Sequence, residues 1–155
     1  MMTQLICDVF NSLKGKTLAT AESCTGGGIG AALTSVPGSS RVYKGGIISY
    51  TDWVKENLLG VDGELLQRYG AVSEPVAKAM AEGARKRLQT DIAVSVTGLA
   101  GPDGDDRGNP VGTVFIGYSD ERCSHATRYS FSGEREAVRT KAICAVLELI
   151  LKENC

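Results

Sequence analysis

The segment that decides the fold reads Ala21-Glu22-Ser23-Cys24-Thr25-Gly26-Gly27-Gly28. Residues 16–21 before it are predicted to form a short strand, and residues 29–33 after it are predicted to open a helix. Such a strand-turn-helix unit can bind an oxyanion or a phosphate through its backbone N–H groups. The spacing is equally consistent with a turn in which Ser23 or Thr25 only caps the helix and the glycines permit close packing.

Strand and helix signals alternate along the rest of the chain. Helices are predicted at about 3–13, in pieces around 54–66, at about 74–88 and at about 133–152, with Ser73 and Ser132 as N-caps of the last two. Strands are predicted at 45–50, 91–97, 111–118 and 123–131, the last two as a hairpin. We therefore expect one α/β domain over residues 1–155, in three α/β/α layers, with a mixed sheet of about five strands and helices on both faces.

Composition argues against several classes of protein. A chain of 155 residues can bury one core, but it has no room for separate catalytic and substrate domains. Its net charge of -1 lacks the positive excess that nucleic acids and anionic lipids attract. The beginning of the chain lacks a signal-peptide pattern, and no stretch approaches the ~20 apolar residues of a membrane span. We expect a cytoplasmic protein that binds neither nucleic acid nor membrane.

The cysteines and the histidine do not indicate a metal site or a catalytic triad. Five cysteines are an odd number, and without C-x-x-C spacing they suit neither a disulfide framework nor a zinc site. The single histidine, His125, lies within the predicted hairpin, away from other catalytic residue types, which is typical of an ordinary strand residue. If Ser23 is a nucleophile, its base must therefore come from elsewhere.

Tyr50 and Lys55 are the candidate partners of Ser23. A lysine can act as a base when burial or neighbouring positive charge lowers its pKa from ~10.4 toward neutrality. Asp52 opposes this, because a nearby carboxylate favours the protonated lysine. Taken alone, Tyr50 could be a half-buried strand residue and Lys55 a solvated helix residue. Cys24 is the rival nucleophile, although a cysteine at a packed turn is as often a small buried hydrophobe.

Two further segments are predicted to complete a pocket. The loop that begins Thr97-Gly98-Leu99-Ala100-Gly101 leaves the end of a strand, which is the usual ligand edge of an α/β sheet, and loops as long as residues 98–110 are often functional. Arg135 and Arg139 are four residues apart on one helix face, where two guanidinium groups suit a phosphate or a carboxylate. The alternative is a solvated face on which Arg139 pairs with Glu136.

A dinucleotide site is the competing interpretation of the glycines. The spacing Gly26-x-Gly28-x-x-Ala31, with Asp52 about 20 residues further on, fits the dinucleotide-binding fingerprint. That interpretation leaves Ser23-Cys24-Thr25 unexplained. No Lys-Ser or Lys-Thr follows the glycines, so the segment is not a P-loop.

Five ordered blocks of the chain resemble the CinA C-terminal domain family, which includes nicotinamide mononucleotide deamidases of the PncC type. The blocks are Thr20-Ala21-Glu22-Ser23-Cys24-Thr25-Gly26-Gly27, Gly70-Ala71-Val72-Ser73-Glu74-Pro75-Val76, Thr97-Gly98-Leu99-Ala100-Gly101-Pro102-Asp103-Gly104, Pro110-Val111-Gly112-Thr113-Val114 and Phe131-Ser132-Gly133-Glu134-Arg135. The resemblance covers nearly the whole chain. It implies hydrolysis of the nicotinamide mononucleotide carboxamide to nicotinate mononucleotide and ammonia, without metal or cofactor, by a homo-oligomer.

The resemblance also implies a site. Ser23 matches the family's nucleophile, and Tyr50 and Lys55 match its activating partners. N–H groups around the turn would stabilise the oxyanion, and the remaining residues would line the substrate pocket. The implied substrate-binding residues are Cys24, Thr25, Gly26, Gly27, Thr97, Gly98, Ala100, Gly101, Arg135 and Arg139. A nucleotide-binding module without turnover and a dinucleotide oxidoreductase remain the alternative functions.

Overall fold

The computed structural model describes residues 2–155 as six α-helices, one 3-10 helix and five strands. The helices are α1 (Met2–Leu13), α2 (Gly28–Thr34), α3 (Asp52–Leu59), α4 (Gly63–Tyr69), α5 (Glu74–Leu88) and α6 (Arg135–Glu153), with the 3-10 helix at Ser39–Arg41. The strands are β1 (Leu18–Glu22), β2 (Tyr43–Ile48), β3 (Ile92–Gly98), β4 (Thr113–Ser119) and β5 (Ser124–Ser130).

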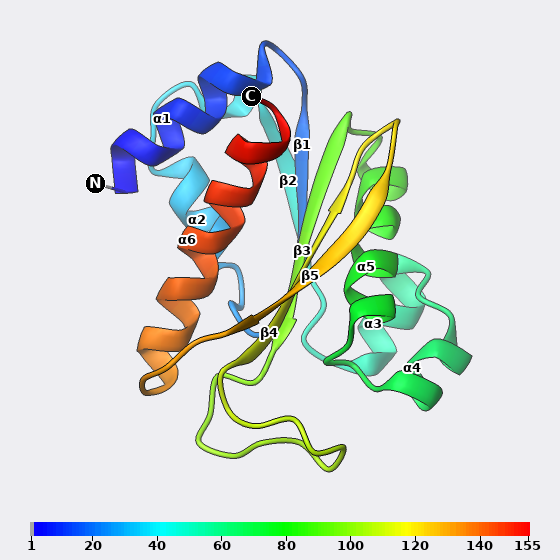
Figure 1. The fold of residues 1–155 in the computed structure, drawn as a ribbon. Coiled ribbons are helices and arrows are strands. Elements are labelled where there is room, and N and C mark those ends of the chain that lie inside the picture. The colour runs from blue at the N-terminus through cyan, green and yellow to red at the C-terminus, as the bar shows by residue number, and fades with distance from the viewer. Residues whose placement is uncertain (1) are drawn as a thin grey trace.

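The strands form one mixed sheet in the order β2-β1-β3-β4-β5. β1 pairs in parallel with both β2 and β3, whereas β4 is antiparallel to both β3 and β5. Helices α1, α2 and α6 cover one face of the sheet and α3, α4 and α5 cover the other (Figure 1). The predicted three-layer α/β/α architecture with a mixed five-stranded sheet is therefore confirmed.

The core lies on both sides of the sheet. Every residue of β1 and β4 is buried, which fits central strands covered on both faces. One apolar cluster joins the sheet to α1, α2 and α6, and a second joins it to α3, α4 and α5. No helix in residues 2–155 is long and apolar enough to cross a membrane.

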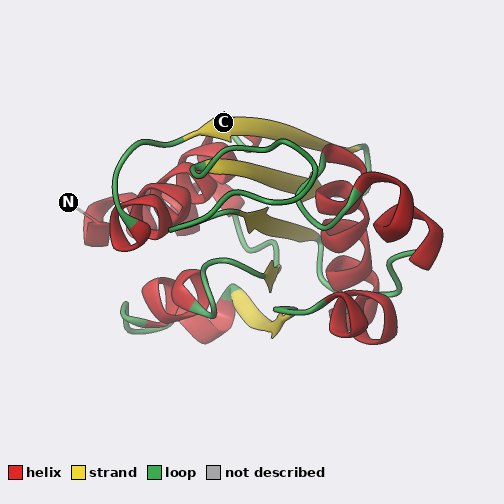
Figure 2. Ribbon diagram, turned by 90° about the horizontal axis from the view of Figure 1, so that it is seen from below, coloured by secondary structure: helices red, strands yellow, loops and turns green. Residues whose placement is uncertain are grey.

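One end of the sheet collects the segments that carry chemistry. Because β1, β2 and β3 are parallel, the residues that follow them, 23–27, 49–51 and 99–112, leave the sheet at the same edge. The start of α6 and the long loop between β3 and β4 lie at this end, which is the lower end in Figure 1 and faces the viewer in Figure 2. Open α/β sheets bind their ligands at this edge.

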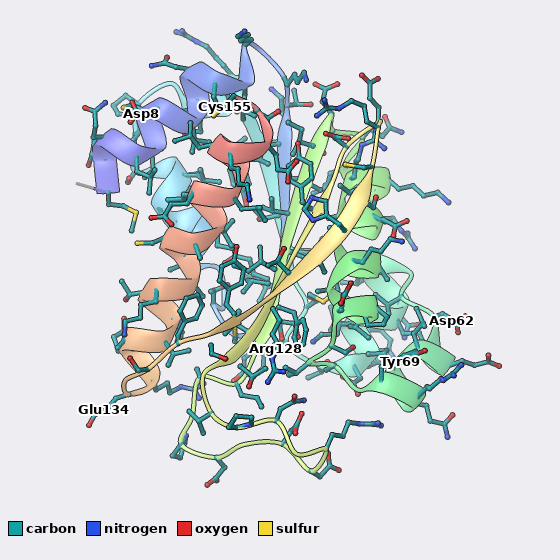
Figure 3. All side chains as sticks on the ribbon, in the orientation of Figure 1. Asp8, Asp62, Tyr69, Arg128, Glu134 and Cys155 are labelled. Carbon is teal, nitrogen blue, oxygen red and sulfur yellow. The ribbon has the colours of Figure 1, made fainter. Side chains whose placement is uncertain are left out.

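Two local predictions need correction. β2 ends at Ile48, so Tyr50 lies in the loop beyond the strand and not at its end. Ser132 does not cap α6: the residue before the helix is Glu134, labelled in Figure 3, and the Ser132 carbonyl and hydroxyl oxygens both accept hydrogen bonds from Lys141 Nζ. Ser73 precedes α5 as predicted, but its hydroxyl donates to the Gly70 carbonyl and makes no cap bond.

Candidate active site

The turn after β1 is held in one conformation by its own residues. Gly26 and Gly27 have φ values of +57° and +101°, which residues other than glycine rarely adopt. The buried Glu22 carboxylate accepts hydrogen bonds from Thr25 Oγ1 at 2.7 Å and from the N–H groups of Ile29 and Gly30 at 2.8 and 3.0 Å. The predicted strand, turn and helix are therefore present, and the Glu22 carboxylate, instead of a side chain at the N-cap residue Gly27, binds the first N–H groups of the helix.

Ser23 and Lys55 come into direct contact at this turn. Lys55 Nζ donates hydrogen bonds to Ser23 Oγ at 3.0 Å and to the Ser49 carbonyl oxygen at 2.7 Å. Only 1% of Lys55 and 8% of Ser23 are exposed. Lys55 is therefore not the solvated helix residue of the alternative interpretation, because α3 packs this lysine inward against the ends of β1 and β2.

Burial lowers the pKa of Lys55 below its ordinary value, and the nearby Asp52 carboxylate opposes this shift without cancelling it. A neutral lysine has two N–H donors and one lone pair. If one N–H donates to the Ser49 carbonyl, the lone pair can accept the Ser23 hydroxyl proton. The arrangement is that of an activated serine nucleophile with a lysine base.

Ser23 and Lys55 open into a cavity of about 310 Å³. Its walls come from the segments after all three parallel strands, from residues 71–72 and from the start of α6. Nine of the predicted site residues line it: Ser23, Cys24, Tyr50, Lys55, Thr97, Gly98, Ala100, Gly101 and Arg135. Thr25, Gly26, Gly27 and Arg139 are not among the residues that line the cavity.

Tyr50 lies at the mouth of the cavity, with 58% of its surface exposed. Its hydroxyl accepts a hydrogen bond from Arg135 Nη2 at 3.2 Å, and Arg135 Nη1 donates to the Gly101 carbonyl oxygen at 2.5 Å. Within residues 2–155, Tyr50 makes no hydrogen bond to Ser23 or Lys55. The structure thus pairs Tyr50 with Arg135 and leaves Ser23 and Lys55 as the directly bonded pair.

Arg139 contacts the turn and not the cavity. Its Nε donates to the Cys24 carbonyl and its Nη2 to the Thr25 carbonyl, both at 3.1 Å, while Nη1 lies 3.4 Å from Glu136 Oε2. All three guanidinium nitrogens of Arg139 already have protein partners. Contact between Arg139 and a substrate therefore stays a prediction.

Cys24 is buried within the apolar cluster beneath α2 and α6. Burial raises the pKa of its thiol to about 11. At neutral pH the sulfur is therefore protonated, which makes it a poor nucleophile because the thiolate is the reactive form. The geometry favours the hydrophobic interpretation of Cys24 and leaves Ser23 as the candidate nucleophile.

Several cavity residues were missed at the level of the sequence. Ala71 and Val72 form a wall that Thr97 secures by donating from its hydroxyl to the Ala71 carbonyl at 2.8 Å. Asp52 and Asp103 add two carboxylates to the lining. Ser49 contributes only a backbone oxygen, which no side-chain pattern can reveal. The block from Gly70 to Val76 was the available signal for the wall.

The structure gives less support to a catalytic role of His125 and to a dinucleotide site. His125, on β5, lies 3.0 Å from Glu153 Oε1 through its Nε2 and stacks on the Tyr118 ring, so it is an ordinary strand residue outside the cavity. A dinucleotide would need the first N–H groups of α2 for its pyrophosphate. The Glu22 carboxylate already occupies the N–H groups of Ile29 and Gly30.

Comparison with known proteins places the chain among similar sequences and structures. A CinA-like protein of Parasynechococcus marenigrum is 55% identical over 121 residues, which are 78% of this chain and 29% of that protein. A CinA-like protein of Gemmatimonas aurantiaca is 47% identical over 137 residues, 88% of this chain and 32% of that protein. The chain thus spans about a third of the length of the curated relatives it matches.

Solved structures agree with this. A CinA superfamily protein from Klebsiella pneumoniae has a TM-score of 0.96 at 33% identity, covering 99% of this chain and 97% of the other. A competence/damage inducible protein from Agrobacterium tumefaciens has a TM-score of 0.94 at 35% identity, covering 99% and 96%. Because the CinA C-terminal domain matches residues 2–154, the chain belongs to the CinA family and corresponds to its C-terminal domain.

Proposed function

We propose that this domain hydrolyses the carboxamide of nicotinamide mononucleotide, giving nicotinate mononucleotide and ammonia, with Ser23 as the nucleophile. The contact of 3.0 Å between Lys55 Nζ and Ser23 Oγ, buried at the base of an open cavity, is the observation that carries the proposal. The choice of nicotinamide mononucleotide as the substrate rests on the resemblance of the sequence blocks to deamidases of the family.

In the first half of the reaction, neutral Lys55 takes the Ser23 hydroxyl proton while the serine oxygen attacks the carboxamide carbon. The new C–O bond gives a tetrahedral intermediate with a negatively charged oxygen. The protonated lysine then supplies a proton to the leaving nitrogen, and ammonia departs from an acyl-enzyme. In the second half, Lys55 takes a proton from water, the hydroxide attacks the ester carbon, and Ser23 recovers its proton as the carboxylate leaves.

The developing oxyanion needs N–H donors that are not already hydrogen-bonded. Hydrogen bonds within the turn exclude two of its N–H groups. The Gly26 N–H donates to the Ser23 carbonyl at 3.0 Å and the Gly28 N–H to the Thr25 carbonyl at 2.9 Å, so both are engaged. The N–H groups of Cys24, Thr25 and Gly27 donate to no other residue of the described chain, and of these three residues only Cys24 lines the cavity. We assign the oxyanion to the Cys24 N–H, with the adjacent Thr25 N–H as the second donor.

The substrate phosphate has one suitable cation at the cavity. Arg135 is exposed at its rim, and the exchange of its weak 3.2 Å contact with Tyr50 for a phosphate would be favourable. Lys55 is buried beside Ser23 and cannot serve both purposes. A cavity of about 310 Å³ is at the small end of ligand sites, and its open side leaves the ribose phosphate near Arg135.

The test measures ammonia released from nicotinamide mononucleotide by purified protein. Ser23→Ala should lower the rate by about 10³-fold or more, since a covalent nucleophile is lost. Lys55→Met should lower it by about 10²–10⁴-fold, the usual contribution of a general base. Lys86→Met, at an exposed lysine of α5, is the matched control and should leave the rate unchanged.

Turnover that survives Ser23→Ala would exclude the serine mechanism. A wild-type protein that shifts its melting temperature with the nucleotide but releases no ammonia would favour the alternative, a nucleotide-binding module without turnover. The same shift with NAD and not with nicotinamide mononucleotide would favour a dinucleotide enzyme.

A further inference from the structure

Glu22 is a buried carboxylate for which the mechanism has no use. Only 2% of it is exposed, yet it reaches neither Ser23 nor Lys55 through a hydrogen bond. Burying a carboxylate is costly unless it is fully hydrogen-bonded. Its partners are Thr25, within the turn, and Ile29 and Gly30, in the first turn of α2.

Arg139 holds the same turn from the other direction. Its guanidinium donates to the carbonyl oxygens of Cys24 and Thr25, so it fixes two consecutive peptide units. A trans peptide is planar, with its N–H opposite its C=O. By pointing the Cys24 carbonyl toward α6, Arg139 points the N–H of Thr25 away from α6.

We propose that Glu22 and Arg139 are a pair of positioning residues that set the orientation of Ser23 and of the oxyanion N–H groups. Glu22 binds the Thr25 hydroxyl and the first N–H groups of α2, and Arg139 binds carbonyls of the turn. The proposal rests on the proposed role of Ser23 as nucleophile. It assigns Arg139 to the enzyme's own backbone and not to the substrate.

Glu22 and Arg139 belong to different elements, so together they fix the turn relative to both the sheet and α6. Glu22 ends β1, and Arg139 is in the second turn of α6, 117 positions along the chain by difference of their numbers. The turn between them has two positive-φ glycines and would otherwise be free to move. A displacement of about 1 Å in a catalytic group can cost about 10²-fold in rate.

The first experiment measures the rate at which a fluorophosphonate labels Ser23, by mass spectrometry of the intact protein. This probe tests the alignment of the serine without requiring that nicotinamide mononucleotide be the substrate. Glu22→Gln replaces one acceptor oxygen by an NH₂ donor that faces other donors, so labelling and kcat should both fall by about 10- to 100-fold. The KM for nicotinamide mononucleotide should change far less than kcat.

Thr25 supplies a rescue test and Thr90 a stability control. Thr25→Val removes the hydroxyl that Glu22 binds and should slow labelling, while Thr25→Ser retains it and should label near the wild-type rate. Thr90→Val removes a buried hydroxyl that donates to the carbonyl of Ile92, the first residue of β3, away from the turn. It should lower the melting temperature without slowing labelling of the folded protein.

Arg139→Met separates positioning from substrate contact. A positioning role predicts slower labelling by the probe, which carries no phosphate monoester, together with a lower kcat. A phosphate contact predicts wild-type labelling and a raised KM for nicotinamide mononucleotide alone, and that result would overturn the inference for Arg139.

Labelling of Glu22→Gln and Thr25→Val at the wild-type rate would overturn the positioning role of Glu22. Normal labelling of Ser23 without ammonia release would count against the proposed substrate only. A wild-type Ser23 that the probe cannot label would count against both proposals, because each requires an aligned nucleophile.

Discussion

Lys55 shows how a single burial changes the chemistry of a residue. On an exposed helix face its amine would stay protonated at neutral pH, but α3 turns it toward the end of the sheet and leaves it one hydroxyl and one carbonyl as partners. Loss of hydration disfavours the charged form and lowers its pKa, while Asp52 raises it. The activity should therefore depend on the balance between burial and one carboxylate.

Asp52→Asn should shift the acidic limb of the pH profile of kcat/KM to lower pH. Lys55 acts as a base only when neutral, so the rate rises as pH passes its pKa. Without the Asp52 charge that pKa falls further, and the neutral form is reached at lower pH. Asp103→Asn is the matched control: it removes another cavity carboxylate, one that does not act on Lys55. A limb that moves equally in both variants, or not at all in Asp52→Asn, would contradict this account.

Cys24→Ala should retain ammonia release close to the wild-type rate. The thiol has a pKa of about 11 and packs in the core, so it is neither ionised at neutral pH nor required for the attack. The variant should lose about 1 kcal/mol in the free energy of unfolding, as is typical of a single substitution. Parallel assays of Cys24→Ala and Ser23→Ala decide between the two nucleophiles, and loss of turnover in the first alone would assign the reaction to the thiol.

At the scale of elements, the position of α3 is set by its contact with α5. Gly83 of α5 faces the end of α3, where a Cβ would overlap with the Leu59 carbonyl oxygen. Gly60 then ends α3 with φ at +71°. The absence of a side chain at Gly83 thus lets the helix that carries Lys55 approach α5 closely.

Gly83→Ala should destabilise the fold and weaken catalysis together. The added methyl must push α3 away from α5, at a cost of about 1–3 kcal/mol in the free energy of unfolding. The same movement lengthens the contact between Lys55 and Ser23, so kcat should fall more than KM changes. Denaturant unfolding and steady-state kinetics measure the two effects.

Gly63→Ala is the control for this element. It lies at the start of α4, and its Cβ would meet only the Glu56 carboxylate, the mobile end of a side chain. It should leave both stability and kcat nearly unchanged. Equal effects in the two variants would show that the close approach of α3 to α5 does not cause the change.

At the scale of the whole molecule, the cavity is closed by segments that are distant in the sequence. The loop between β3 and β4 is attached to α4 by Arg107, whose Nη1 and Nη2 donate to the carbonyls of Arg68 at 3.0 Å and Gln67 at 2.6 Å. Asp105 stiffens the same loop by accepting from the N–H groups of Arg107 and Asn109. The residues of this loop that line the cavity are Leu99, Ala100, Gly101 and Asp103.

Arg107→Ala should raise KM with a smaller change in kcat. Release of the loop from α4 loosens one cavity wall, while Ser23 and Lys55 keep their own contacts. Hydrogen exchange should increase in the loop and at the end of α4. Arg87→Ala, at an exposed arginine of α5, should change neither quantity. A fall in kcat with an unchanged KM would show that the loop acts on the catalytic pair instead.

The sequence predicted the layers, the five strands and the strand-turn-helix unit around Ser23. Alternation of apolar strands with amphipathic helices leaves few ways to bury both faces of a sheet, so the architecture followed from local patterns. The end of β2 and the start of α6 were misjudged by a few residues. Strand ends depend on pairing with β1, and the start of α6 depends on where the preceding chain crosses the sheet edge.

The sequence alone supplies the components of the candidate site: a serine at a glycine turn, a lysine five residues beyond a tyrosine, and a loop after a strand. Only the tertiary structure decided which of these meet. It joined Ser23 to Lys55, paired Tyr50 with Arg135, turned Arg139 toward the backbone and gave Glu22 its place under the turn. The physical reason is that a hydrogen bond or a lowered pKa depends on burial and distance, and both arise only when three parallel strands bring their ends to one edge.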